Sequence, residues 1–129
     1  MASSGEPRVV RGAQAPLLRG PDDAVSRLLI DGETGARAFS LAWLRFPPGG
    51  KTEPHVRDVE ECIYVLRGRT RVTTGAGEFI LEAGDALFIP ADTEHAHENM
   101  GDTDLEQLAI FAPQGPERLF LDFPPATDH

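Results

Sequence analysis

Two short segments of this chain carry the side chains best suited to chemistry. The first contains His55, Arg57 and Glu61, and the second contains His95 and His97. Because side chains on an extended strand alternate between its two faces, His55 and Arg57 share one face, and His95 and His97 share another. Imidazoles and carboxylates can bind divalent metals, whereas a guanidinium can only donate hydrogen bonds, and so binds anions. Whether the two segments meet depends on the fold.

The rest of the chain predicts many short strands that would position these segments. Runs with β character are bounded by Gly, Pro or Asp, and no stretch holds a useful helical period. This pattern is typical of an all-β antiparallel sandwich or barrel. The predicted strands are Ser26–Ile30, Ala38–Phe46, Glu61–Arg67, Arg69–Thr74, Glu78–Leu81, Ala86–Ile89, Glu94–Asn99 and Leu105–Phe111, with Arg8–Arg11 and Arg118–Phe123 as further candidates and Asp31–Gly35 as a hairpin loop.

The longest predicted strand, Ala38–Phe46, is apolar on both faces. One face carries Phe39, Leu41 and Trp43, and the other carries Ala42, Leu44 and Phe46. A strand of this kind is covered on both sides, by the core on one and by a partner subunit on the other. The sequence therefore predicts a homodimer.

Composition narrows the classes of protein. A chain of 129 residues predicts a single domain, and its one cysteine allows no intramolecular disulfide. The net charge of −9, without Lys/Arg clusters, argues against nucleic acid as a partner. No apolar run has the length of a signal peptide or a membrane span, so we expect a cytoplasmic protein without a membrane partner. Eleven of the twelve basic residues are arginine, a bias typical of GC-rich bacterial coding.

The two segments are similar to the two signature motifs of the cupin superfamily. The first motif runs Gly-x5-His-x-His-x3,4-Glu-x6-Gly, and the second runs Gly-x5-Pro-x-Gly-x2-His-x3-Asn. Two positions depart from them: Arg57 replaces the second histidine, and Asp92 replaces a glycine. The matching positions are Gly49, His55, Glu61 and Gly68 in the first motif, and Gly84, Pro90, His95 and Asn99 in the second.

The resemblance, which covers residues 38–112, implies a double-stranded β-helix, or jelly-roll barrel, with His55, Glu61 and His95 as metal ligands. We expect a single barrel domain over residues 25–123, an N-terminal arm at 1–24 that is partly disordered, and a disordered tail at 124–129. Two imidazoles and a carboxylate suit Fe(II) best, and also Mn, Ni, Co or Zn.

Arg57 complicates this assignment because a guanidinium has no lone pair to offer a metal. Three interpretations stay open. Arg57 can bind a substrate carboxylate or phosphate beside a three-ligand metal. His97, on the face of His95, can take the vacated ligand position. Alternatively, the barrel holds no metal and binds an anionic ligand directly. An ion pair of Arg57 with Glu53, Asp58 or Glu60 is the structural alternative.

Two functions follow. The first is a metal-dependent enzyme acting on a polar or anionic small molecule, in which Arg57 and His97 line the reaction site. For this enzyme a dioxygenase-type reaction is favoured over an isomerase or lyase reaction. The second is a non-catalytic binding module that uses Arg57 as its anchor. No Gly-rich phosphate loop, nucleophile elbow or cysteine pair suggests another chemistry.

Overall fold

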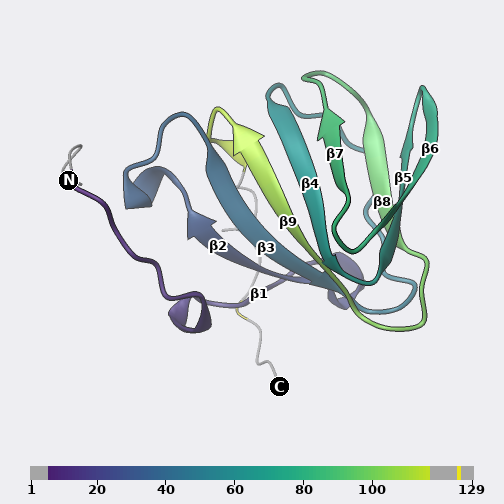
Figure 1. The fold of residues 1–129 in the computed structure, drawn as a ribbon, viewed down its shortest axis with the longest axis horizontal. Coiled ribbons are helices and arrows are strands. Elements are labelled where there is room, and N and C mark those ends of the chain that lie inside the picture. Colours follow the sequence, from purple (N-terminus) through teal and green to yellow (C-terminus); the bar gives the residue numbers. More distant parts are fainter. Residues whose placement is uncertain (1–5, 117–124, 126–129) are drawn as a thin grey trace.

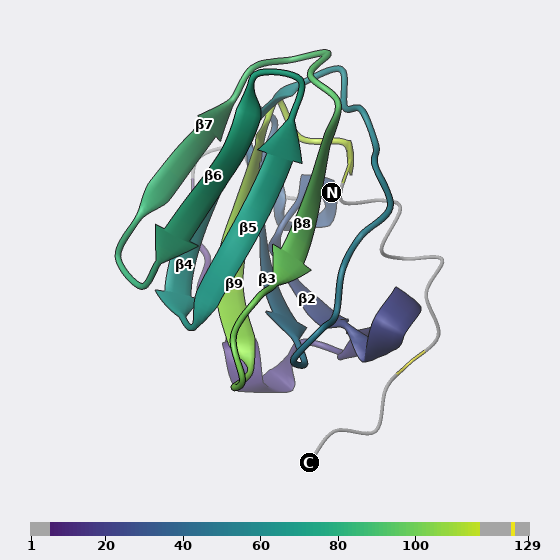
Figure 2. The ribbon, with the colours of Figure 1, turned by 90° about the vertical axis from the view of Figure 1, so that its right-hand side faces the viewer.

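In the computed structural model, which describes residues 6–116 and Pro125, two antiparallel sheets face each other. The larger sheet has the strand order β1-β2-β3-β9-β4-β7 and the smaller one β6-β5-β8 (Figures 1 and 2). The strands are β1 Leu18–Arg19, β2 Val25–Ile30, β3 Ser40–Phe46, β4 Glu60–Arg67, β5 Arg69–Thr74, β6 Gly77–Glu82, β7 Ala86–Ile89, β8 His95–Asn99 and β9 Leu105–Ala112. Three short 3-10 helices lie near the N-terminus: η1 Gly12–Gln14, η2 Pro21–Asp23 and η3 Gly32–Thr34.

The predicted all-β antiparallel fold is confirmed, and eight predicted strands agree with β2 to β9 within two residues at each end. The predicted strand Arg8–Arg11 is wrong, because these residues form no strand. The Arg8 guanidinium instead donates to the carbonyl of Thr34 at 2.7 Å, and Leu18–Arg19 takes the place beside β2. The candidate Arg118–Phe123 lies outside the described residues. Pro125, in the predicted tail, forms an isolated bridge with Leu18.

The core lies between the two sheets and follows the alternation of the strands. On β9 every second side chain is buried, and β4 buries Glu61, Ile63 and Val65 in the same way. Central core residues from both sheets are Ala42, Phe46, Ile63, Val65, Val72, Leu81, Ile89, Leu105, Ala109 and Phe111. Some side chains that point into this interior are polar, and the candidate site residues are among them.

Glycines and acidic residues with positive φ set the turns around the site. Gly49, Gly68 and Gly84 have φ angles of 80°, 88° and 93°, which side chains with a Cβ rarely adopt. Asp92, at a usual glycine position of the second motif, keeps the left-handed conformation with φ 66°. Asn99 closes the turn after β8, because its amide donates to the carbonyls of Phe46 and Thr103 and its Oδ1 accepts from Gly101.

Candidate metal and ligand site

The two histidine-bearing segments meet as neighbouring strands. The chain from Lys51 to His55 runs antiparallel to β8, with isolated bridges Lys51↔Glu98 and His55↔His95. The amide of His55 donates to the carbonyl of His95 at 3.0 Å, and the reverse bond is 2.9 Å long. The hydroxyl of Thr52 accepts from the amide of His97. This pairing brings the first motif onto the edge of the smaller sheet.

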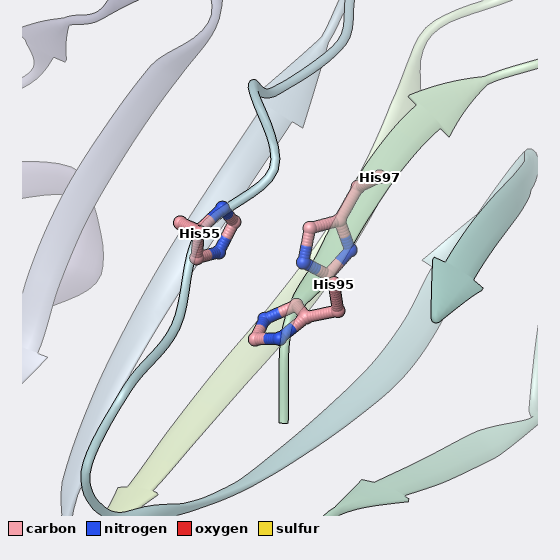
Figure 3. Close-up of side chains that lie close together, drawn as sticks. All are labelled: His55, His95 and His97. Atoms are coloured by element: carbon pink, nitrogen blue, oxygen red, sulfur yellow. The ribbon is translucent and has the colours of Figure 1, made fainter. Parts of the chain in front are cut away.

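Three imidazoles gather inside the barrel at this edge. Their candidate ligand atoms all lie within 4.8 Å of one another. The ring centroids of His55 and His95 are 4.3 Å apart, those of His95 and His97 5.3 Å, and those of His55 and His97 5.9 Å. Figure 3 shows the rings turned toward a common centre. Three histidines so placed could hold a metal ion.

Backbone contacts fix the tautomers of two of these rings. The Nδ1 of His55 lies 2.8 Å from the carbonyl of Glu53, and the Nδ1 of His95 lies 2.9 Å from the carbonyl of Thr93. Because a carbonyl can only accept, each Nδ1 carries the hydrogen and donates it. In the neutral ring Nε2 then keeps its lone pair, which is the usual arrangement of a metal-binding histidine.

The carboxylate of Glu61, on β4, contacts one member of the histidine cluster. Its Oε1 lies 3.2 Å from the Nε2 of His95, and both side chains are buried. The contact lacks hydrogen-bond geometry, so Glu61 Oε1, His95 Nε2 and His97 Nδ1 are buried atoms without a hydrogen-bond partner in the described structure. Unpaired polar atoms at such depth are costly. All three are metal-donor types, so the residues present fit a divalent metal.

Burial and mutual repulsion keep most of the cluster uncharged. Desolvation, followed by the neighbouring His95, His55 and Arg57, lowers the pKa of His97 to about 3. Desolvation is also the main reason that the pKa of His55 is lowered. Burial acts in the same direction on His95 and is the largest single effect there, but the contact with Glu61 and the hydrogen bond to the carbonyl of Thr93 together outweigh it, so the pKa of that ring is raised. Neutral imidazoles are the form that binds metals.

Arg57 borders the same interior. No ion pair among the described residues includes its guanidinium, so the alternative contacts with Glu53, Asp58 and Glu60 are not made. Its Nε is buried and has no hydrogen-bond partner there. Burial lowers the pKa of Arg57, and the charge of Glu61 opposes that shift. A half-buried cation in this state is suited to receive an anion.

Two adjoining cavities open beside the cluster. The outer one, of about 280 Å³, lies between the η2 segment and the His55 strand, and its walls include Val25, Leu44 and Phe46. The inner one, of about 60 Å³, reaches Glu61 and His97. Leu44, Phe46, Thr52, His55 and Arg57 line both. Arg57 therefore stands where a ligand would pass from one cavity to the other.

The structure thus brings His55, His95 and His97 together, places Glu61 against His95, and sets Arg57 at the cavities. Sequence reasoning missed Gln107, which lines the inner cavity from β9. Its signal was present: it is the polar residue in an inward series that otherwise contains Leu105, Ala109 and Phe111.

Comparisons with known proteins agree with this fold. A family model described as "Cupin domain" matches residues 42–111. The polyketide synthase CurC of Streptomyces cyaneus is 29% identical over 86% of this chain and 73% of its own length. An oxalate-binding protein of Thermotoga maritima is 36% identical over 57% of this chain and 62% of its own length. The structure of the polyketide cyclase RemF of Streptomyces resistomycificus matches with TM-score 0.72 and 25% identity, covering 83% of this chain and 80% of its own.

The chain spans only about three fifths of the length of some curated relatives, 60% in one case and 62% in another.

No helix in the described part of the chain has the length and apolar character that crossing a membrane requires.

Proposed function

The chain belongs to the cupin family, and from this premise we propose that it is a small metal-dependent enzyme acting on a polar or anionic small molecule. The observation that carries the proposal is the cluster of His55, His95 and His97, whose candidate ligand atoms lie within 4.8 Å of one another, with the buried carboxylate of Glu61 3.2 Å from His95. Relatives and structural neighbours that carry enzyme names, such as a polyketide cyclase, support the class. The substrate and the reaction are part of the proposal.

We assign the metal to His55, Glu61 and His95, with His97 in the ligand position that Arg57 cannot fill. His97 is added because its donor atom lies with those of the other two histidines. Fe(II) is the favoured ion, and Mn, Ni, Co and Zn suit the same donors. A metal bound there supplies a Lewis acid or, as Fe(II), oxygen chemistry, and on this ground we favour a dioxygenase-type reaction over an isomerase or lyase reaction.

The protein's own side chains supply binding and orientation. Arg57 anchors the anionic group of the substrate by charge-assisted hydrogen bonds at the junction of the cavities. The carbonyls of Glu53 and Thr93 hold two imidazoles in the binding tautomer. The apolar walls of Leu44 and Phe46 exclude water around the substrate.

The alternative function is a metal-free binding module for an anionic small ligand. One observation favours it: Arg57 is a half-buried cation near the histidines, where its charge adds to the desolvation that chiefly lowers the pKa of His97 and His55, and the same repulsion disfavours a divalent cation. In this case Arg57 is the anchor, and no turnover follows.

Elemental analysis separates the two functions. Protein purified without chelator or a metal-binding tag, then incubated anaerobically with Fe(II), should contain about one metal per chain, and His95→Ala should lose it because a ligand is removed. If the protein contains no metal, either as purified or after incubation with Fe(II), the binding module is the supported function instead.

The substitution Arg57→His provides a second test, in which metal content and substrate binding are both measured. If Arg57 binds substrate beside an existing metal, metal content barely changes while substrate binding falls by about 100-fold or more, as expected when a buried charged contact is lost. If the arginine has replaced a metal site, the new imidazole raises metal affinity sharply. Arg69→His is the matched control, because Arg69 has a half-exposed side chain and pairs with Glu82 on the surface.

A further inference from the structure

Gln107 carries a buried amide on a strand whose other inward side chains are apolar. It lies on β9 between Leu44 of β3 and Val65 of β4, and its exposed fraction is 1%. An amide in this position destabilises the fold unless it is hydrogen-bonded. Its Oε1 has no such partner in the part of the chain that the structure describes. A ligand or water group in the adjoining cavity is therefore the natural partner.

The inner cavity offers room for that partner. It measures about 60 Å³, and Gln107 shares it with His97, Glu61 and Arg57. A void of about 10–15 Å³ of this kind already holds a water molecule, so a hydroxyl or a carbonyl enters easily. The small side chain of Ala109 lines this space, at an inward position of β9 whose neighbours Leu105 and Phe111 are bulkier.

The row of residues that contains Gln107 links the two cavities. Cross-strand pairs place Ser26, Leu44 and Gln107 side by side on neighbouring strands. Ser26 lines the outer cavity, Gln107 the inner one, and Leu44 both. The Oγ of Ser26 is likewise buried without a partner in the described chain. A ligand that spans both cavities therefore lies over an apolar centre with polar groups at each end.

We propose that Gln107 determines specificity, selecting small carboxylic acids that carry a hydroxyl group on an apolar body. The carboxylate lies on Arg57, the apolar body packs on Leu44 and Phe46, and the hydroxyl enters the inner cavity. A hydroxyl suits Gln107 because it can donate to the amide oxygen and also accept from the amide nitrogen. The inference rests on the proposed function only in placing the ligand in these cavities.

Binding of three probes by titration calorimetry tests the inference: benzoate, 3-hydroxybenzoate and 4-hydroxybenzoate. The wild-type protein should bind at least one hydroxybenzoate about tenfold or more tightly than benzoate, as expected for one hydrogen bond to an otherwise unpaired buried group. Gln107→Met keeps an unbranched side chain of similar length and removes the amide. It should abolish this preference and leave benzoate affinity within about twofold, since benzoate makes no such hydrogen bond.

Two further variants complete the experiment. Ser40→Ala is the matched control, because Ser40 is another buried, unpaired polar residue of the larger sheet but lines neither cavity described above; it should retain the preference. Ala109→Val fills the inner cavity and should remove the preference even if Gln107→Met does not fold. A wild-type protein without a hydroxyl preference, or a preference that survives in Gln107→Met, overturns the inference.

Metal content, measured on the same samples, keeps this result distinct from the proposed enzyme. Gln107→Met should leave it unchanged. A metal-free protein with a Gln107-dependent preference contradicts the metal enzyme alone. A metal-loaded protein without the preference contradicts the role of Gln107 alone.

Discussion

His97 is enclosed by groups that oppose its protonation. Desolvation, with the adjacent His95, His55 and Arg57, lowers its pKa to about 3, against about 6.5 for an unfolded histidine. Its donor atom is therefore available to a metal at any pH near neutral. Arg57 contributes to this state although it cannot bind the metal itself, so the replacement of a histidine by arginine is compatible with a set of neutral ligands.

The same pKa shift predicts the pH dependence of stability. Between pH 6.5 and 3, His97 is protonated in the unfolded chain but stays neutral in the folded chain. The free energy of unfolding therefore decreases as pH falls. The slope is about 1.4 kcal/mol per pH unit, and wild type should lose about 2 kcal/mol more than His97→Asn between pH 6.5 and 5. Urea denaturation of metal-depleted protein at both pH values measures this difference.

His95 contributes with the opposite sign. Its pKa is raised, because Glu61 and the carbonyl of Thr93 together outweigh the opposing effect of burial. The stability it contributes is therefore present below the pKa of the unfolded chain and is lost as pH rises through its folded pKa. Comparing wild type with His97→Asn cancels this contribution, because both proteins keep His95. Parallel pH profiles of the two proteins would contradict a neutral, buried His97.

At the scale of elements, the turns decide which strands meet. Gly68 separates β4 from β5 and so passes the chain from the larger sheet to the smaller one, where β8 carries two of the histidines. A Cβ at this position would lie 2.9 Å from the carbonyl oxygen of Asp104 and 3.0 Å from the Cα of Leu105. Its φ of 88° adds backbone strain for any other residue.

A series of three glycine substitutions separates these two effects. Gly68→Ala combines strain and close contact and should lower the free energy of unfolding by about 2 kcal/mol or more. Gly84→Ala has the strain at φ 93° without a close contact, and should lower it by about 1 kcal/mol. Gly75→Ala has neither and should stay within about 0.5 kcal/mol of wild type. Chemical denaturation gives the order, and equal effects at Gly68 and Gly84 would argue against the contact with Asp104.

At the scale of the whole molecule, the outer face of the larger sheet carries an apolar region. Two cross-strand rows run over it. The first row contains Leu41, Ile110, Cys62 and Phe88, and the second contains Trp43, Leu108, Tyr64 and Ala86. Phe88 is 60% exposed and Tyr64 38% exposed in the single chain. Contiguous apolar rows of this kind are typical of an interface, and a second copy of the chain is the predicted partner.

We expect a homodimer formed through this face. Phe88→Glu places a charge in the first row and should weaken dimerisation at least tenfold, since a charge within an apolar interface is left without a partner. Ile80→Glu is the control, because Ile80 is 45% exposed but lies on β6 of the other sheet. Sedimentation analysis over a range of concentrations measures both. A monomeric wild type, or equal weakening by both variants, rules out this interface.

The sequence by itself determined eight of the nine strands in the described residues, the turns between them and two of the three clustered histidines. Short alternating runs between glycines predict strands because these signals are local: the alternation of side chains and the φ angle of a glycine depend on near neighbours. Asp92 is an example, since it stands at a motif position where glycine is usual and adopts the left-handed conformation with φ 66°. The motif spacing likewise predicts His55 and His95 as candidate site residues, without knowledge of the bridge between them.

Only the tertiary structure decided which side chains share the interior. The position of His97 beside His55 depends on pairing between segments about 40 residues apart, and that pairing is set by hydrogen bonds between β8 and the Lys51–His55 segment. The cavities arise where β2, β3 and β9 lie next to one another, and so does the amide oxygen of Gln107, which has no hydrogen-bond partner among the described residues. Such contacts join distant parts of the chain, so no local pattern of residues specifies them.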